Sequence, residues 1–278
     1  MDLSAFTALV REQGSLHYRS LPWRDTSDPY AIWISEVMLQ QTQVSRVEGR
    51  WEEWLRRFPS VGALADAQLN EVLVVWQGMG YNSRAKRLQE CAQIICQEHG
   101  GVIPRGYDEL VALPGIGPAT AAGIRAFAYD EPGVYLETNV RSVFIHELFP
   151  EREQVADSEL IPLVSQTCPP AGQDVRGWYY ALLDYGAHLK KTLPNPSRRS
   201  KHHSRQSEFQ GSNRQKRSFV LRCVLESPQT ALQLQEALDA FELAAGRPRV
   251  APAELSRILE KLEEEGLIQQ KGELWLVG

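Results

Sequence analysis

The chain has 278 residues, which is enough for one large domain or two ordinary ones. Hydrophobic residues make up 43% of it and charged residues 23%, a composition typical of a globular protein. No run of about 18 apolar residues is present, and the first residues lack the basic start and apolar core of a secretory signal. These features argue against a membrane span and predict a protein of the cytosol or a nucleoid-like compartment, while the net charge of −5 does not by itself indicate a nucleic-acid binder.

Residues 1–190 are predicted to form an all-α body, because no strand alternation of useful length is present. Apolar residues at helical spacing predict helices at 4–13, 30–44, 46–57, 61–65, 68–76, 83–98, 107–112, 118–129, 138–147, 157–167 and 174–190. The four cysteines are scattered over the chain and lack the grouped spacing of a zinc or iron–sulfur site, so we expect buried thiols and no metal.

Residues 191–214 are rich in Pro, Ser, Asn, Arg and His, which argues against regular structure. From Lys190 to Arg217 there are nine bases against one acid, a net charge of +8, whereas Ser218 to Gly278 carries −4. A free linker is one interpretation, and we favour a basic strap held against a polyanion.

Residues 215–278 are predicted to be a separate small α+β unit. Helices are expected at 216–226, 230–240 and 252–265, followed by two short strands around Lys271-Gly272. This order resembles a winged helix-turn-helix, but the third helix is acidic, and phosphate repulsion disfavours groove reading. The composition favours a packing or protein-contact module.

The segment Glu36-Val37-Met38-Leu39-Gln40-Gln41 places a carboxylate among bulky apolar neighbours. Burial raises the pKa of a carboxyl group and makes it a candidate proton donor near neutral pH. An ordinary surface glutamate on an amphipathic helix is the alternative.

Two glycines, Gly115 and Gly117, separate the predicted helices 107–112 and 118–129. Such a turn exposes backbone N–H groups at a helix start, which suit a phosphate. A lone Gly-x-Gly is also explained by a tight turn, but with Leu113-Pro114 before it and Ala119-Thr120-Ala121 after it we interpret it as a helix-hairpin-helix clamp on a DNA backbone.

A second carboxylate, Glu137, follows the Pro132-Gly133 loop and precedes the helix start at Thr138-Asn139. It is either a helix-capping acid or the partner of a catalytic pair drawn from distant segments.

Together these motifs resemble the helix-hairpin-helix, Gly-Pro-Asp superfamily of DNA glycosylases, closest to its MutY adenine branch. The likeness covers roughly residues 1–190. It rests on Leu21-Pro22-Trp23-Arg24, Ser35–Val44, Gly78–Ala85, Leu113–Ala121 and Ala181–Ala187. It implies a mainly α, two-lobed glycosylase fold, here with a small C-terminal winged-helix-like domain.

The resemblance also implies a role for each matched residue. Glu36 would protonate the departing base, Glu137 would be the catalytic anion, and Asn139 would steady Glu137. A protonated and an ionised carboxyl suit N-glycosidic cleavage, which builds opposite charges on base and sugar. Trp23, Arg24, Leu39 and Asp184 would line the base pocket, Gln41 and Tyr81 would wedge into the duplex during base flipping, and Gly115, Gly117 and Thr120 would hold the DNA backbone.

Three features depart from the superfamily. Glu137 stands where an aspartate is usual, and its extra methylene can move the carboxylate by about an ångström. No clustered cysteines follow Ala187, so we expect no iron–sulfur cluster and no other cofactor, with Arg198, Arg199, Lys201 and Arg205 of the strap contacting DNA phosphates instead. Ala119 replaces the lysine of bifunctional members, which predicts a glycosylase without strand cleavage.

We therefore predict three parts: a glycosylase domain at 1–190, a basic strap at 191–214 and a winged-helix-like domain at 215–278. The expected function is release of adenine mispaired with 8-oxoguanine or guanine in base-excision repair. Mismatched thymine or uracil, or another lesion, is the runner-up substrate, and a non-catalytic DNA-binding protein is a further alternative. We expect a nucleoid-associated monomer that binds damaged duplex DNA, with a protein partner on the winged helix.

Overall fold

The computed structural model describes residues 2–201, 203 and 208–278. The chain packs as two compact units, the first made of residues 1–51 and 103–205 and the second of residues 52–102 and 206–278. The chain therefore leaves the first unit after Trp51 and returns to it at Ile103. The predicted three-part division is a different partition of the chain and stays a prediction.

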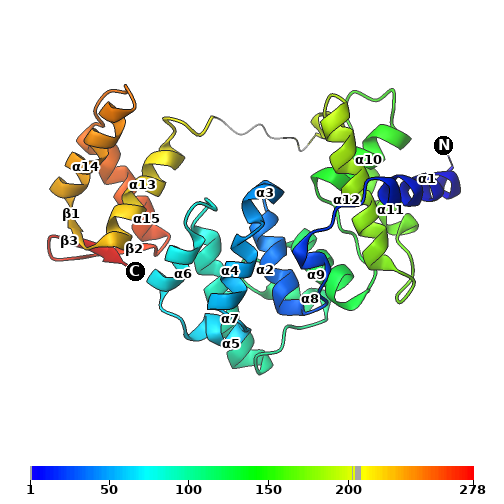
Figure 1. Cartoon of the computed structure of the whole chain (residues 1–278), viewed down its shortest axis with the longest axis horizontal. Coiled ribbons are helices and arrows are strands. Elements are labelled where there is room, and N and C mark those ends of the chain that lie inside the picture. The colour runs from blue at the N-terminus through cyan, green and yellow to red at the C-terminus, as the bar shows by residue number, and fades with distance from the viewer. Residues whose placement is uncertain (1, 202, 204–207) are drawn as a thin grey trace. The chain divides into compact units, whose positions relative to one another are not determined.

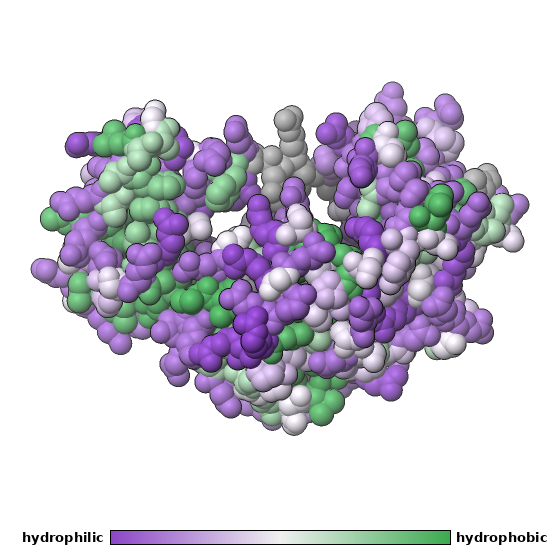
Figure 2. Space-filling model, in the orientation of Figure 1, coloured by the Kyte–Doolittle hydropathy of each residue, from purple (hydrophilic) through white to green (hydrophobic). Residues whose placement is uncertain are grey.

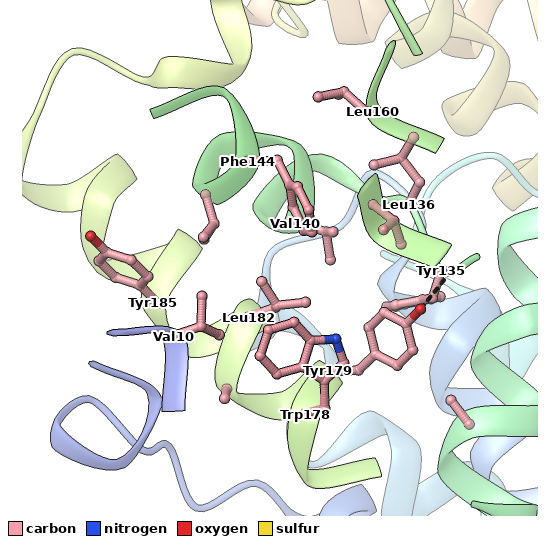
Figure 3. Packing of buried hydrophobic residues seen from close by; sticks show 14 of the residues in the cluster. Val10, Tyr135, Leu136, Val140, Phe144, Leu160, Trp178, Tyr179, Leu182 and Tyr185 are labelled. Carbon is pink, nitrogen blue, oxygen red and sulfur yellow. Dashed lines mark hydrogen bonds between the residues drawn. The ribbon is translucent and has the colours of Figure 1, made fainter. Parts of the chain in front are cut away.

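Within the described residues, the named elements of the first unit are all helices. They are α1 (Leu3–Leu16), η1 (Pro22–Arg24), α2 (Pro29–Leu39), α3 (Val44–Val47), α8 (Tyr107–Ala112), α9 (Pro118–Tyr129), α10 (Thr138–Leu148), α11 (Asp157–Thr167), α12 (Val175–Thr192) and η2 (Pro196–Arg199). Helix α12 packs against α1 and α10, which Figure 1 shows side by side, and α2 packs against α9. The core between them holds Val10 of α1, Val140 and Phe144 of α10, and Trp178 and Leu182 of α12 (Figure 3).

Local signals explain where the helices of the site begin. At α2, Pro29 takes the first position, and the side chain of Asp28 accepts the backbone N–H groups of Tyr30 and Ala31 at 3.1 and 3.4 Å. At α9, Pro118 again takes the first position, and Asp130 ends the helix in the left-handed conformation.

The second unit combines helices with one small sheet. It contains α5 (Val61–Asp66), α6 (Leu69–Trp76), α7 (Ser83–His99), α13 (Asn213–Glu226), α14 (Ala231–Ala244) and α15 (Pro252–Glu264), and α4 (Arg50–Arg57) enters it from the first unit. Strands β1 (Gln229–Thr230), β3 (Leu274–Val277) and β2 (Ile268–Lys271) form an antiparallel sheet in that order, and the Lys271–Leu274 pair closes the predicted hairpin. The predicted mainly α fold with a small C-terminal α+β part is confirmed.

Some predicted boundaries were wrong. The helix expected at 30–44 ends at Leu39, because Gln40 leaves the helical conformation at ψ 111° and Gln41 follows with a left-handed φ of 54°. The segment expected to lack regular structure contains the last turn of α12, the short helix η2 and the start of α13. The two-residue strand β1 was not predicted, since strands of that length leave no alternation to detect.

Hydrophilic residues cover most of the face drawn in Figure 2. Among the described residues, no helix has the length and apolar character needed to cross a bilayer.

Candidate active site

Glu36 lies near the end of α2 with its side chain only partly exposed. Its carboxylate rests against Gly123 of α9, where any larger side chain would collide with it. Burial, opposed by a hydrogen bond from Tyr135 and aided by repulsion from Glu137, raises the pKa of Glu36 from 4.5 to about 8. A carboxyl group with that pKa is protonated at neutral pH and can act as a general acid.

Tyr135 is a residue of this site that the sequence did not single out. Its hydroxyl donates to the Glu36 carboxylate, and burial next to Glu36 and Glu137 raises the pKa of Tyr135 well above its ordinary value. Its ring lies edge-on to Phe127 and Tyr179, at centroid distances of 5.2 and 5.4 Å. Its backbone N–H donates to the Tyr179 hydroxyl at 3.3 Å (Figure 3). The hydroxyl is therefore held in place by a packed aromatic cluster.

Glu137 is the N-cap of α10, so it is both the helix-capping acid and the second carboxylate of the site. One carboxylate oxygen accepts the backbone N–H groups of Asn139 at 2.5 Å and Val140 at 3.0 Å. The other accepts the Asn139 side-chain amide at 3.3 Å. Burial raises the pKa of Glu137, and the N–H groups and nearby positive charges oppose that rise.

Helices α2 and α10 thus bring the two predicted carboxylates close enough to repel each other. Their surroundings differ, because only Glu137 accepts backbone N–H groups at a helix start. This difference favours a protonated Glu36 and an ionised Glu137.

Two of the residues predicted to line the base pocket, Arg24 and Asp184, form a buried ion pair. The two terminal nitrogens of Arg24 donate to the two Asp184 oxygens at 2.7 and 2.8 Å, and Arg19 Nε donates to Asp184 at 2.6 Å. The Arg24 guanidinium also lies over the Tyr180 ring, 4.3 Å from its centroid. The pair therefore braces α12 against the segment that precedes α2.

The other two predicted pocket residues differ in exposure. Trp23 is buried edge-on against Trp51, at a centroid distance of 6.2 Å, whereas Leu39 stays partly exposed at the end of α2. Only Leu39 of the four offers an open apolar surface.

The predicted hairpin is present between α8 and α9. Gly115 has φ 81°, which side chains rarely adopt, while Ile116 is buried beneath the turn. Gly117 is the exposed N-cap of α9, and Thr120 accepts the side-chain amide of Gln40 at 3.0 Å. The hydrogen bond ties the turn after α2 to the hairpin.

The two predicted wedge residues share an unusual backbone. Gln41 and Tyr81 have φ 54° and 49°, and both are exposed. Left-handed backbone at a residue other than glycine costs about 1–3 kcal/mol and is concentrated at functional sites. Gln41 belongs to the first unit and Tyr81 to the second.

The predicted strap residues lie in different surroundings. Arg198 and Lys201 are exposed, and Arg205 lies outside the described residues. Arg199 instead directs its guanidinium to backbone carbonyls at the end of α10 and just beyond it. It donates to Ile145 at 3.1 Å, Phe149 at 2.7 Å, and Pro150 and Arg152 at 3.0 Å each. We therefore assign Arg199 to the structure of this segment and keep phosphate contact as a prediction for Arg198 and Lys201.

The residues after Ala187 do not fit an iron–sulfur cluster, since positions 188–201 contain no cysteine and η2 packs there against α10. Among the described residues, no group of three or more His, Cys, Asp or Glu is arranged to hold a metal ion. That the protein works without a cofactor remains a prediction.

The paired carboxylates and the hairpin are typical of one class of DNA repair protein, and comparison with known sequences supports this class. Residues 34–161 match the HhH-GPD superfamily of base-excision DNA repair proteins. An adenine DNA glycosylase of Mycolicibacterium smegmatis is 34% identical over 268 residues, covering 91% of this chain and 88% of its own length. One of Mycobacterium tuberculosis is 45% identical over 127 residues, covering 45% of this chain and 42% of its own. This chain belongs to the adenine DNA glycosylase family, as its motifs predicted.

Solved structures agree at the level of fold. A thermostable thymine-DNA glycosylase has a TM-score of 0.59 at 23% identity, covering 66% of this chain and 86% of its own. An endonuclease III in a DNA complex has a TM-score of 0.56 at 16% identity, covering 77% and 94%.

Proposed function

We propose that this protein is a monofunctional adenine DNA glycosylase of base-excision repair, acting on adenine opposite 8-oxoguanine or guanine. Family membership supports the reaction class, and the observation that carries the proposal is the Glu36–Glu137 pair. A protonated carboxyl beside an anchored carboxylate is the pair that hydrolysis of an N-glycosidic bond requires.

In the proposed reaction Glu36 donates its proton to a ring nitrogen of the flipped-out adenine, which makes the base a neutral leaving group. As the bond to the sugar breaks, positive charge builds on the sugar, and ionised Glu137 stabilises it electrostatically. Water then adds to the sugar carbon and loses a proton, leaving an abasic site. Gly117 and the N–H groups at the start of α9 would hold a DNA phosphate beside the site.

Single-turnover release of the base from duplexes containing A:8-oxoguanine, A:G, T:G and U:G tests this function. We expect adenine to be released from the first two, and Glu36→Gln to slow release at least about a hundredfold, because an amide cannot donate the proton. The variant should still bind the duplex. Release of thymine or uracil in place of adenine would reassign the substrate, and release from none would overturn the enzymatic function.

The absence of strand cleavage has its own test. Ala119 provides no amine for a Schiff base at the position where bifunctional members carry lysine. We expect product strands to break only after alkali treatment, and borohydride to trap no covalent protein–DNA adduct. Efficient trapping would contradict a monofunctional mechanism.

A further inference from the structure

Lys190, in the last turn of α12, reaches the active site through one intermediate residue. Its Nζ donates to Oδ1 of Asn139 at 2.9 Å, and the Asn139 amide nitrogen donates to Oε2 of Glu137 at 3.3 Å. An ammonium group can only donate, so it selects the carbonyl oxygen of the amide and turns the NH₂ group towards the carboxylate. The contact therefore fixes which way the Asn139 side chain faces.

The close approach of α12 to Asn139 is built into the helix. Gly186 lies one turn before Lys190 on the same face of α12, and a side chain at Gly186 would collide with the backbone and Cβ of Asn139. One face of α12 thus contacts Asn139 twice, through the bare backbone of Gly186 and through the amine of Lys190. Two contacts from one helix face indicate that the fold holds Lys190 against Asn139.

The charge of Lys190 also acts on Glu137. Among the described residues, the charged and titratable groups that interact with this carboxylate are Glu36 on α2, Tyr135 before α10, Arg141 on α10 and Lys190 on α12. Arg141 is paired with Asp157 through bonds of 2.9 and 2.7 Å, whereas Lys190 contacts a neutral amide. Lys190 therefore supplies positive charge that a bound carboxylate does not already offset.

We propose that Lys190 is a positioning residue of this glycosylase, which orients the Asn139 amide and keeps Glu137 ionised while Glu36 stays protonated. The role of Lys190 in catalysis rests on the proposed function, but its effect on the ionisation of Glu137 can be measured in the protein without DNA. Lys190 is exposed, so its influence on Glu137 is screened by salt.

The first test is a carbon-13 NMR titration of the glutamate carboxyl groups in the full-length protein, with Glu137→Gln to assign the signal. In Lys190→Met we expect the pKa of Glu137 to rise by about 0.5 to 1 unit, because an opposing positive charge is lost. Lys190→Arg should retain the wild-type value. Lys191→Met removes the same charge from the neighbouring exposed position and should also leave it unchanged.

The second test is the pH profile of single-turnover adenine release. The low-pH limb, which reports ionisation of Glu137, should move to higher pH in Lys190→Met by the shift seen in the titration. Added salt should move that limb in the wild type and much less in Lys190→Met. A Glu137 titration in Lys190→Met that matches wild type would overturn the assignment, whereas failure of the wild type to release adenine would overturn the proposed function alone.

Discussion

At the scale of single residues, the sequence led to Glu36 and Glu137 because apolar neighbours and a helix start mark them locally. Sequence reasoning missed Tyr135, because an aromatic residue in an extended segment has the sequence pattern of a core residue. Tyr135 does pack in the core, against Phe127 and Tyr179. Its contact with Glu36 joins distant segments, and no local pattern reports such a contact.

Tyr135→Phe should change the pKa and the orientation of the Glu36 carboxyl group without unfolding the site. The hydroxyl lowers the pKa of Glu36, so its loss should raise that pKa beyond about 8 and move the high-pH limb of the rate profile to higher pH. The rate near neutral pH should fall about tenfold, because the carboxyl loses the bond that orients it. Tyr129→Phe removes a phenol bonded to the Ile103 carbonyl and should leave the profile in place. An unmoved limb in Tyr135→Phe would contradict the role of the hydroxyl.

At the scale of elements, helical periodicity predicted α1, α2 and α8 to α12 of the first unit but not the short helices η1, α3 and η2. It failed where the backbone turns for non-local reasons. Ser200 bridges to Val155, and this contact orders a segment whose composition suggested none. At α2, Gln40 and Gln41 both leave the helical backbone conformation and end the helix before the predicted residue 44.

The two hairpin glycines should respond differently to alanine. Gly117 has an ordinary backbone with φ −86° and open space where a Cβ would sit, so Gly117→Ala should cost less than about 1 kcal/mol of stability. DNA binding should weaken about tenfold, or about 1.4 kcal/mol, because the methyl group meets the approaching phosphate. Gly115→Ala, at φ 81°, should lower stability as well. Titration of labelled duplex and urea unfolding separate the two effects, and unchanged binding in Gly117→Ala would argue against phosphate contact at this turn.

The neighbouring arginines of the strap form a second matched pair. Arg199→Met leaves the carbonyl groups at the end of α10 without this hydrogen-bond donor. The free energy of unfolding should fall by about 2 kcal/mol, because bonds to a charged donor are lost. Arg198→Met should leave stability unchanged but flatten the dependence of DNA affinity on salt. Equal stability of the two variants would contradict the structural role assigned to Arg199.

At the scale of the whole molecule, the buried Glu36 should lower the free energy of unfolding as pH rises. Glu36 binds a proton in the folded protein up to about pH 8 but in the unfolded chain only up to about 4.5, so the free energy of unfolding falls between these values. The slope from this residue is at most about 1.4 kcal/mol per pH unit. Glu242, whose pKa is lowered by its bond with Arg247, acts with opposite sign but below that window.

Urea unfolding at several pH values checks this expectation. Glu36→Gln should show a shallower decline and be the more stable protein above neutral pH, because an amide carries no charge to desolvate. Equal slopes in the two proteins would show that Glu36 is not the source.

The division of each unit between two stretches of chain has a consequence during synthesis. Helices α1 and α2 are made first, yet Phe6, Val10 and Ile32 belong to a core cluster whose other members all come from residues beyond Ile103. At about 5–20 residues per second, the ribosome needs on the order of ten seconds to add them. During that interval the apolar faces of α1 and α2 lack most of the core that covers them in the folded protein, so we expect the nascent chain to bind chaperones at the tunnel exit.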